Sequence, residues 1–319
     1  MSVEGIDSAV YVPSDGNVNP SDLTQALARG AREGGVQIYQ DTAVTGIRCR
    51  NGRVIGVESA DSLIECESVA ICAGLWSREI ARLAGASIPL MPSFHQYMVT
   101  EPIDGIGPDM PGVRDPDHLS YFREEVGGLA AGGYEFNPVP YDEVPRADDP
   151  DYRLFPAMTE QFAQFMPGMI ERFPQLETVG VKRWFTALES FTEDTHFILG
   201  EMPEVRGLYT ATGFNAMGIA AGGGAGMALA HWIAESQAPY DLWTVDIRRF
   251  SALHRSDRNL KGRVLEGQGR HYALHWPHYE SNAGRPLRRS ALYDRLKASG
   301  ACFGSKSGWE RANWFAPAG

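Results

Sequence analysis

A glycine-rich stretch from residue 213 to residue 226 constrains the fold of this chain more than any other segment. It follows a short apolar segment, 207–212, that is typical of a strand. It precedes apolar residues at 227, 229, 230 and 233, whose spacing predicts a helix. Glycines let a backbone approach a ligand closely, and a helix N-terminus offers unpaired N–H groups to electron-rich oxygens. The stretch therefore suits a phosphate or a flavin.

The same stretch has a purely structural interpretation, in which small residues let a helix pack tightly on a sheet. It is not a P-loop, because no Lys-Ser/Thr pair follows the glycines. It is not a clean dinucleotide fingerprint either, because the acidic residue expected further on is not clearly placed. From this stretch alone, the structural and the cofactor interpretations carry equal weight.

Composition narrows the protein class. The chain has 319 residues, of which 43% are hydrophobic, so it is globular and has enough residues for a large core. Its formal net charge of -11 argues against a general nucleic-acid binder, which needs a basic face. No apolar run approaches the ~20 residues of a membrane span.

Cysteine usage and the N-terminus bear on the compartment. Cys49, Cys66, Cys72 and Cys302 lie far apart without a CxxC motif, which indicates reduced thiols rather than a disulfide framework or a zinc site. Residues 1–7 do not have the pattern of a signal or transit peptide. We expect a cytoplasmic location, or the mitochondrial matrix if the source is eukaryotic.

The first third of the chain mixes helices and strands. Asn19 is the expected cap of a helix from about residue 21 to residue 33, which would bury Leu23, Ala26, Leu27 and Ala31. Asn51-Gly52 predicts a hairpin. The last strand, with Cys72 inside it, is apolar on both faces, as in a buried parallel sheet. Ser77 would cap a helix over 78–83. The predicted strands span residues 9–12, 36–39, 44–49, 53–57, 64–66 and 68–74.

From residue 88 the pattern changes to strands separated by turns rich in proline, glycine and aspartate. This middle part resembles an antiparallel substrate domain, with an acidic surface loop at 139–152 and a helix over 159–173. A further helix is expected over 246–253, before a polar, aromatic tail. The predicted strands of the middle part span residues 94–100, 119–122, 129–133 and 179–189.

Four stretches resemble the FAD-dependent dimethylglycine/sarcosine dehydrogenase family, part of the D-amino-acid-oxidase superfamily. They are Asp15–Leu23, the Ala-Gly-Leu-Trp turn within Ile71–Trp76, Thr212–Trp232, and the tail from Tyr293 to Phe315. The tail is the most specific, since it resembles the segment that leads into a tetrahydrofolate-binding domain. The resemblance covers nearly the whole chain.

Two departures from the family pattern affect the expected function. The family begins with a βαβ unit whose Gly-x-Gly-x-x-Gly cradles the FAD pyrophosphate, and it commonly carries a histidine linked to the flavin there. Neither feature is found in this sequence, and the folate-binding domain is absent too. We therefore expect an internal fragment, with tetrahydrofolate relevant only in a full-length parent.

The resemblance implies two catalytic residues. His95, in a His-Gln-Tyr strand, and Tyr121, before Phe-Arg-Glu, match the family's catalytic positions. A histidine titrates near neutrality and can manage an amine proton. The structural alternative is a hydrogen-bonded sheet histidine and a cross-strand tyrosine. Arg123 and Arg183 are candidates to bind a substrate carboxylate, although a surface or structural role is favoured for each.

The resemblance also implies a set of flavin contacts, with Val44 touching the adenine side through its backbone. His271, His275 and His278 form an H-x3-H-x2-H cluster, but a packed aromatic tail is favoured over a metal site there. The flavin contacts are Val44, Ala73, Gly74, Trp76, Gly213, Phe214, Met217, Gly218 and Ile219.

The expected architecture is α/β (α+β). An incomplete FAD-binding domain of the two-dinucleotide-binding type, at 1–87 and 195–236, joins an antiparallel-sheet substrate domain at 88–194, with a C-terminal extension at 237–319. The expected activity is oxidative N-demethylation of a small N-methylated amino acid, with an electron-transfer partner. An oxygen-using oxidase of the 4-methylaminobutanoate type and a catalytically silent binding module are the alternatives.

Overall fold

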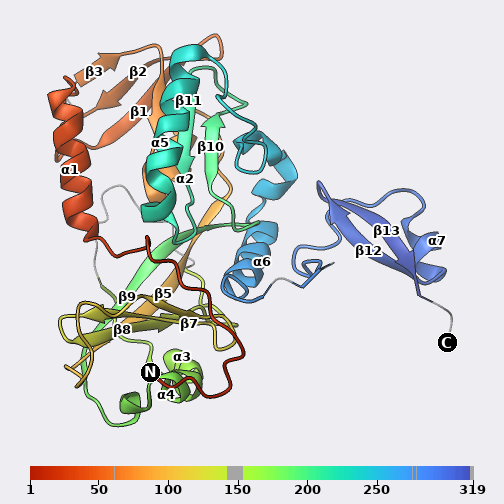
Figure 1. Ribbon diagram of the computed structural model, residues 1–319. Coiled ribbons are helices and arrows are strands. Elements are labelled where there is room, and N and C mark those ends of the chain that lie inside the picture. The colour runs from red at the N-terminus through yellow and green to blue at the C-terminus, as the bar shows by residue number, and fades with distance from the viewer. Residues whose placement is uncertain (61, 142–153, 275, 278, 317–319) are drawn as a thin grey trace.

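The computed structural model describes residues 1–60, 62–141, 154–274, 276–277 and 279–316. Within these ranges the fold is mixed α/β, with strands in sheets of order β1-β2-β3, β10-β11-β4, β12-β13 and β6-β7-β8-β5-β9. Figure 1 shows the first two sheets beside the helices α1 and α5, and the five-stranded sheet below them. The predicted α/β character with antiparallel sheets is confirmed.

A small meander and a mixed sheet lie next to each other. The meander consists of β1 (Val44–Arg50), β2 (Arg53–Ser59) and β3 (Ser62–Glu65), all antiparallel. The hairpin at Asn51-Gly52 forms as predicted, with φ of 52° and 72° at those residues. In the mixed sheet, β4 (Val69–Ile71) runs parallel to β11 (Leu208–Thr212), and β10 (Ile198–Glu201) is antiparallel to β11. A shared core that includes Val54, Ile71 and Leu208 joins them.

Helix α5 (Gly218–Glu235) follows β11 and packs on the mixed sheet (Figure 1). Gly200 of β10 permits the contact, because a Cβ there would lie 2.6 Å from the Trp232 ring. The predicted strand–turn–helix order is confirmed, but the turn is shorter than expected. It ends at Met217, so the later glycines are part of the helix rather than of a loop.

The five-stranded sheet is antiparallel and is covered on one face by short helices. Its strands are β5 (Leu90–Thr100), β6 (Val113–Asp115), β7 (Ser120–Glu125), β8 (Gly128–Gly133) and β9 (Val181–Thr192). The helices are α3 (Thr159–Phe162), η2 (Ala163–Phe165), α4 (Met166–Arg172) and η3 (Pro174–Glu177). The range 159–173, predicted as one helix, is divided into α3, η2 and α4. Met98, Phe122 and Phe162 belong to the core between the two layers.

The C-terminal third begins with two single turns, η4 (Ile247–Arg249) and η5 (Ala252–Arg255), where a helix over 246–253 was expected. Phe250 and Ser251 between them have extended backbone, which interrupts a helix. Helix α6 (Asp257–Gln268) then packs against β5 and β9. Helix α7 (Tyr293–Ala298) and the hairpin of β12 (Ala301–Lys306) and β13 (Trp309–Phe315) complete the described chain.

The largest departures from the sequence predictions lie in the first third. Helix α1 (Pro20–Glu33) forms and is capped by Asn19 as expected, yet it buries no residue. Residues 9–12 and 36–39 are not strands, because no described strand pairs with them. Strand β4 covers only residues 69–71, and Cys72 is exposed rather than buried. Ser77 is the first residue of α2 (Ser77–Arg82), after η1 (Gly74–Trp76), so it is not the cap.

Part of the predicted acidic loop, 142–153, lies outside the described residues, as do His275 and His278. The proposed domain boundaries stay a prediction. None of the described helices is both long and apolar enough to cross a membrane.

Candidate active site

One face of the five-stranded sheet carries polar and aromatic side chains that are only partly covered. Residues directly opposite each other in antiparallel strands share a face. Tyr97 lies opposite Phe185 on one side and Gly132 on the other, and Gly132 lies opposite Tyr121. His95, two residues before Tyr97, shares this face. The sheet therefore brings both predicted catalytic residues onto one surface.

His95 and Tyr121 are in contact. The His95 Nε2 atom lies 3.3 Å from the Tyr121 hydroxyl. Burial, helped by the nearby His271, lowers the pKa of His95 to about 3. Burial, followed by the nearby Tyr272, raises the pKa of Tyr121 well above its usual value. At neutral pH the pair is therefore an uncharged imidazole and a protonated hydroxyl, and the imidazole tautomer decides which of the two donates the hydrogen bond.

A missing side chain makes room for Tyr121. A Cβ on Gly132 would lie 2.5 Å from the Tyr121 Cζ atom, far inside van der Waals contact. The tyrosine ring therefore lies across the glycine backbone of the neighbouring strand. Gly132 sets the ring position that allows the hydroxyl to reach His95.

Aromatic rings and one arginine surround the pair. The Tyr134 ring stacks on His95, with centroids 4.3 Å apart and an interplanar angle of 11°. The Tyr272 ring lies 4.5 Å from that of Tyr134 and 5.9 Å from that of Tyr121. The guanidinium of Arg114 lies 4.3 Å over the Tyr272 ring. The site thus combines an apolar wall with a cation at its edge.

Two carboxyl groups border the same site. Burial raises the pKa of Glu189 to about 7, against the opposing effect of a hydrogen bond from Tyr134. Burial also raises the pKa of Glu135 to about 7, opposed by a backbone hydrogen bond and reinforced by the charge of Glu189. A carboxyl with such a pKa exists in both protonation states near neutral pH, so it can take up or release a proton there.

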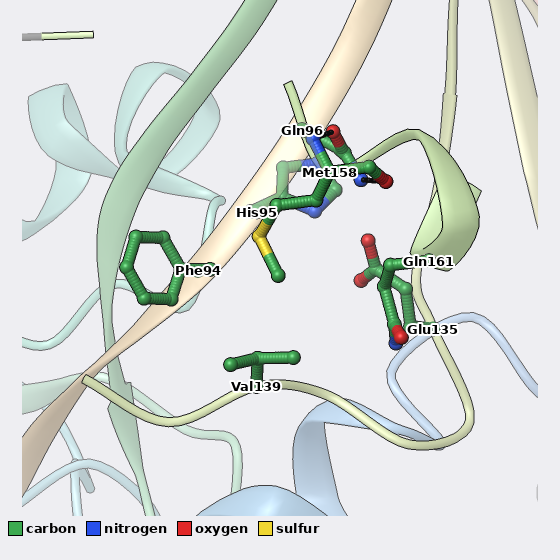
Figure 2. A pocket seen from close by; sticks show the side chains of 7 residues that line it. All are labelled: Phe94, His95, Gln96, Glu135, Val139, Met158 and Gln161. Carbon is green, nitrogen blue, oxygen red and sulfur yellow. Dashed lines mark hydrogen bonds between the residues drawn. The ribbon is translucent and has the colours of Figure 1, made fainter. Parts of the chain in front are cut away.

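A small pocket opens beside β5. Figure 2 shows the Glu135 carboxylate and the Gln161 amide across the pocket from Phe94. The pocket connects His95 and Glu135 with a polar rim, and its lining residues are Phe94, His95, Gln96, Glu135, Val139, Met158 and Gln161.

The two stretches predicted to contact a flavin lie side by side. Strands β4 and β11 are parallel neighbours, so the turns after their carboxyl ends meet at the same edge. The Thr212 hydroxyl donates to the Gly74 carbonyl over 2.9 Å. Gly74 and Gly213 have φ of 54° and 63°, in the left-handed region that favours glycine. The structure thus brings the two glycine turns together.

The glycine turn is also tied to the five-stranded sheet. The amide of Thr192, the last residue of β9, donates to the Asn215 side-chain oxygen over 3.0 Å. Asn215 is 1% exposed, and its own amide donates to the Gly213 carbonyl over 2.5 Å. This buried amide therefore fixes the turn relative to the strand that carries Glu189.

The start of α5 fits a flavin. No side chain caps the helix at Met217, so its first N–H groups have no capping partner. Gly218 is exposed and Ile219 is 55% exposed, and a Cβ on Gly218 would meet only the Phe214 Cβ, at 3.8 Å. Open backbone N–H groups beside glycines can donate hydrogen bonds to an electron-rich ring atom or oxygen.

The remaining predicted flavin residues lie around this edge or farther away. Ala73 is half-buried and belongs to the turn after β4, with Trp76 one turn further on. Val44 lies on β1 of the meander and packs, like Ala73, against the core that includes Ile71. It shares a core with the turn but belongs to a different sheet.

The arginines predicted to bind a carboxylate have local partners. Arg123 forms an ion pair with Glu125. The Arg183 guanidinium lies 4.5 Å over the Phe185 ring. His271 packs 4.8 Å from the Tyr134 ring, in an aromatic environment as expected. Among the described residues, no group of three or more His, Cys, Asp or Glu side chains could hold a metal ion.

Comparison with known proteins gives the family. The family described as FAD dependent oxidoreductase matches residues 2–232. This chain belongs to that family. The FAD dependent oxidoreductase central domain matches residues 237–290.

Several characterised relatives are similar over the length of this FAD dependent oxidoreductase chain. Sarcosine dehydrogenase, mitochondrial, of Homo sapiens is 40% identical over 100% of this chain and 35% of its own length. The 4-methylaminobutanoate oxidase (formaldehyde-forming) of Paenarthrobacter nicotinovorans is 38% identical over 99% of this chain and 38% of its own length. The pyruvate dehydrogenase phosphatase regulatory subunit, mitochondrial, of Mus musculus is 36% identical over 99% of this chain and 36% of its own length. The chain thus spans little more than a third of these relatives.

The fold is similar to that of a solved flavoenzyme. L-proline dehydrogenase from P. horikoshii superposes with a TM-score of 0.64 at 24% sequence identity, covering 74% of this chain and 61% of the other. This likeness concerns the fold of the oxidoreductase alone.

Sequence reasoning missed several residues of this site, among them Glu189, Glu135 and Arg114. Each became visible only through strand register or aromatic stacking. Glu189 lies two residues after Ala187 on β9, and Ala187 lies opposite His95. Residues two apart on a strand share a face, so Glu189 faces the site. A sequence pattern alone could show the alternation in β9, but not which strand lies beside it.

Proposed function

We propose that this chain carries the substrate side and part of the flavin site of an enzyme that oxidatively demethylates a small N-methylated amino acid. The observation that carries this proposal is the His95–Tyr121 pair, on a sheet that Thr192 ties to the Asn215 turn. Kinship with sarcosine dehydrogenase at 40% identity supports an amine substrate.

The cofactor is proposed to be FAD. When bound, FAD supplies an acceptor for a hydride equivalent from the carbon next to the substrate nitrogen. The glycine turns would allow close approach of the backbone, and the uncapped start of α5 would offer N–H donors. The proposed flavin contacts are Val44, Ala73, Gly74, Trp76, Gly213, Phe214, Met217, Gly218 and Ile219.

The protein's own contribution is orientation and proton management. His95 and Tyr121 are proposed as the catalytic residues that position the amine, because both are uncharged at neutral pH and linked to each other. The Tyr134 and Tyr272 rings would exclude water from the reacting end. A cation would bind the substrate carboxylate, and we add Arg114 to the candidates already considered.

We further propose that residues 1–87 and 195–236 form the FAD-binding part, 88–194 the substrate domain and 237–319 an extension. In a longer parent protein, tetrahydrofolate would capture the one-carbon unit and an electron-transfer partner would reoxidise the flavin. These assignments rest on the family resemblance.

Two alternatives are supported by specific relatives. Kinship with 4-methylaminobutanoate oxidase at 38% identity favours an enzyme that uses oxygen as acceptor. Kinship with the pyruvate dehydrogenase phosphatase regulatory subunit at 36% identity favours a binding module without catalysis.

Flavin titration followed by anaerobic substrate addition separates these classes. We expect the purified chain to take up FAD with a perturbed absorbance spectrum. Sarcosine, dimethylglycine or 4-methylaminobutanoate should then bleach the flavin band without oxygen. Readmitted oxygen restores the band rapidly in an oxidase and slowly in a dehydrogenase. A protein that stays colourless in excess FAD would contradict the proposed competence of this chain.

A further inference from the structure

Two carboxyl oxygens in the active site have no hydrogen-bonding partner among the described residues. They are Oε2 of Glu189 and Oε2 of Glu135, and both are shielded from solvent. A buried acceptor left unpaired destabilises a folded protein. Such groups deserve a functional explanation, especially where two of them border one site.

Glu189 lies between the His95 pair and the glycine turn. On β9, Ala187 is opposite His95, Glu189 is two residues further on, and Thr192 holds Asn215 of the turn. Glu189 as a residue is partly exposed, whereas Glu135 is only 2% exposed. Of the two carboxyls, Glu189 is therefore the one placed to meet a substrate.

The two predicted catalytic residues cannot hold an amine proton. Burial keeps His95 uncharged at neutral pH and the Tyr121 hydroxyl protonated. An N-methylated amino acid arrives as an ammonium ion, because alkylamines have pKa values near ~10. Its proton must leave before the neutral amine is oxidised. Glu189, with a pKa of about 7, is half-ionised at neutral pH and can accept it.

The groups that face Glu189 come from several elements. The electrostatic environment of a carboxylate here includes tyrosine hydroxyls, a second carboxyl, two imidazoles and one arginine. The titratable and charged groups around it are Tyr134, Tyr121, Tyr272, Glu135, His95, His271 and Arg114.

We propose that Glu189 accepts the proton that the substrate's ammonium group loses before oxidation, an inference that rests on the proposed function. The N–H bond breaks, an O–H bond forms at the Glu189 carboxylate, and the electron pair stays on nitrogen. No electron is transferred in this step. The hydride equivalent leaves the neighbouring carbon afterwards, with FAD as the acceptor that the family activity supplies.

The test is the pH dependence of anaerobic flavin reduction by sarcosine in the FAD-loaded chain. Because only ionised Glu189 can accept a proton, the wild-type rate should fall about tenfold per pH unit below a midpoint near 7. Glu189→Gln should lose this acidic limb of the pH profile, that is, the fall in rate below pH 7. Its rate at pH 7 should be lower by about 10²-fold or more. It should recover toward pH 10, where the free amine is the bound species. Glu189→Asp should retain the limb.

Glu193→Gln is the matched control. Burial also raises the pKa of Glu193 to about 7, but its carboxylate accepts a hydrogen bond from Asn259 and lies outside the site. Its pH profile should match the wild type. A direct readout without substrate is the infrared carboxyl titration of the chain, in which Glu189→Gln should remove one group that titrates near pH 7.

The outcomes are separable. A wild-type flavin that no N-methylated amino acid reduces would contradict the proposed function and this inference with it. If the wild type is reduced and Glu189→Gln keeps the same pH profile, the function stands and the inference is overturned. An equal loss at every pH would assign Glu189 a structural role only. Loss of the limb in Glu135→Gln but not in Glu189→Gln would also overturn the assignment.

Discussion

The two halves of the proposed site differ in how complete they are. The sheet side is enclosed, with His95 8% exposed, stacked on Tyr134 and in contact with Tyr121. The face of α5 is open, with Ile219 55% exposed and nothing within 4 Å of a Cβ built on Gly222. The side chains of the sheet side contact one another, whereas the face of α5 presents small residues to a ligand or to another part of a protein.

This difference shows how the fold divides the work. Side chains positioned by β-sheet pairing are held by neighbours on three sides, so their geometry is present before any ligand binds. Backbone donors at a helix start need only an open approach. Substitutions on the sheet side should therefore change mainly the reaction rate, and substitutions at the start of α5 should change mainly the affinity for FAD.

Gly132→Ala should have the largest effect and should act on the chemistry. Its Cβ would lie 2.5 Å from the Tyr121 Cζ atom, so the ring must move away from His95. We expect a loss of about 10²-fold in the rate of flavin reduction, as for a small misplacement of the substrate, and a destabilisation of about 1–3 kcal/mol from overpacking. Stopped-flow reduction and denaturant unfolding measure the two effects.

The double variant Gly132→Ala with Tyr121→Phe is the control for this interpretation. If the glycine acts only by positioning the hydroxyl, the flavin of the double variant should be reduced by substrate no more slowly than that of Tyr121→Phe alone. Additive losses in rate would break the link between Gly132 and Tyr121.

Gly218→Ala should have a smaller effect and should act on cofactor binding. The new Cβ meets only the Phe214 Cβ at 3.8 Å, so the free protein should keep its stability within about 1 kcal/mol. Close approach of a flavin to the backbone would be blocked. We expect the affinity for FAD to fall about tenfold, which is about 1.4 kcal/mol, with an unchanged reduction rate at saturating FAD.

Gly30→Ala in α1 is the matched control, because a Cβ there also meets nothing within 4 Å. It should stabilise the protein by about 1 kcal/mol as a helix substitution and leave the FAD affinity unchanged. Equal FAD affinities for Gly218→Ala and the wild type would contradict the assignment of Gly218 to the flavin site.

Local signals in the sequence were sufficient for some elements. The Asn19 cap before Pro20 gave the start of α1, and Asn51-Gly52 gave the hairpin between β1 and β2. These signals act over a few residues and do not depend on distant partners. The positions of His95 and Tyr121 came from resemblance to a family, while their 3.3 Å contact came from the structure.

Other features depend on partners distant in sequence. Residues 36–39 have a strand-like pattern, but a strand forms only where another strand pairs with it, and none of the described strands does. The glycines after Met217 are helical because α5 packs on the sheet through Trp232. Glu189 joins the site through the β5–β9 register. Register and packing of this kind are not written in local propensity.

The central claim is that His95, held by Tyr121 on the sheet, serves amine oxidation by a flavin bound at the glycine turns. Its most direct test is the rate of anaerobic flavin reduction by sarcosine in His95→Gln, in the FAD-loaded chain. We expect an unchanged flavin spectrum and affinity with a rate lower by about 10²-fold, because the amine is no longer positioned for reaction. A rate equal to that of the wild type, with flavin bound, would contradict the account.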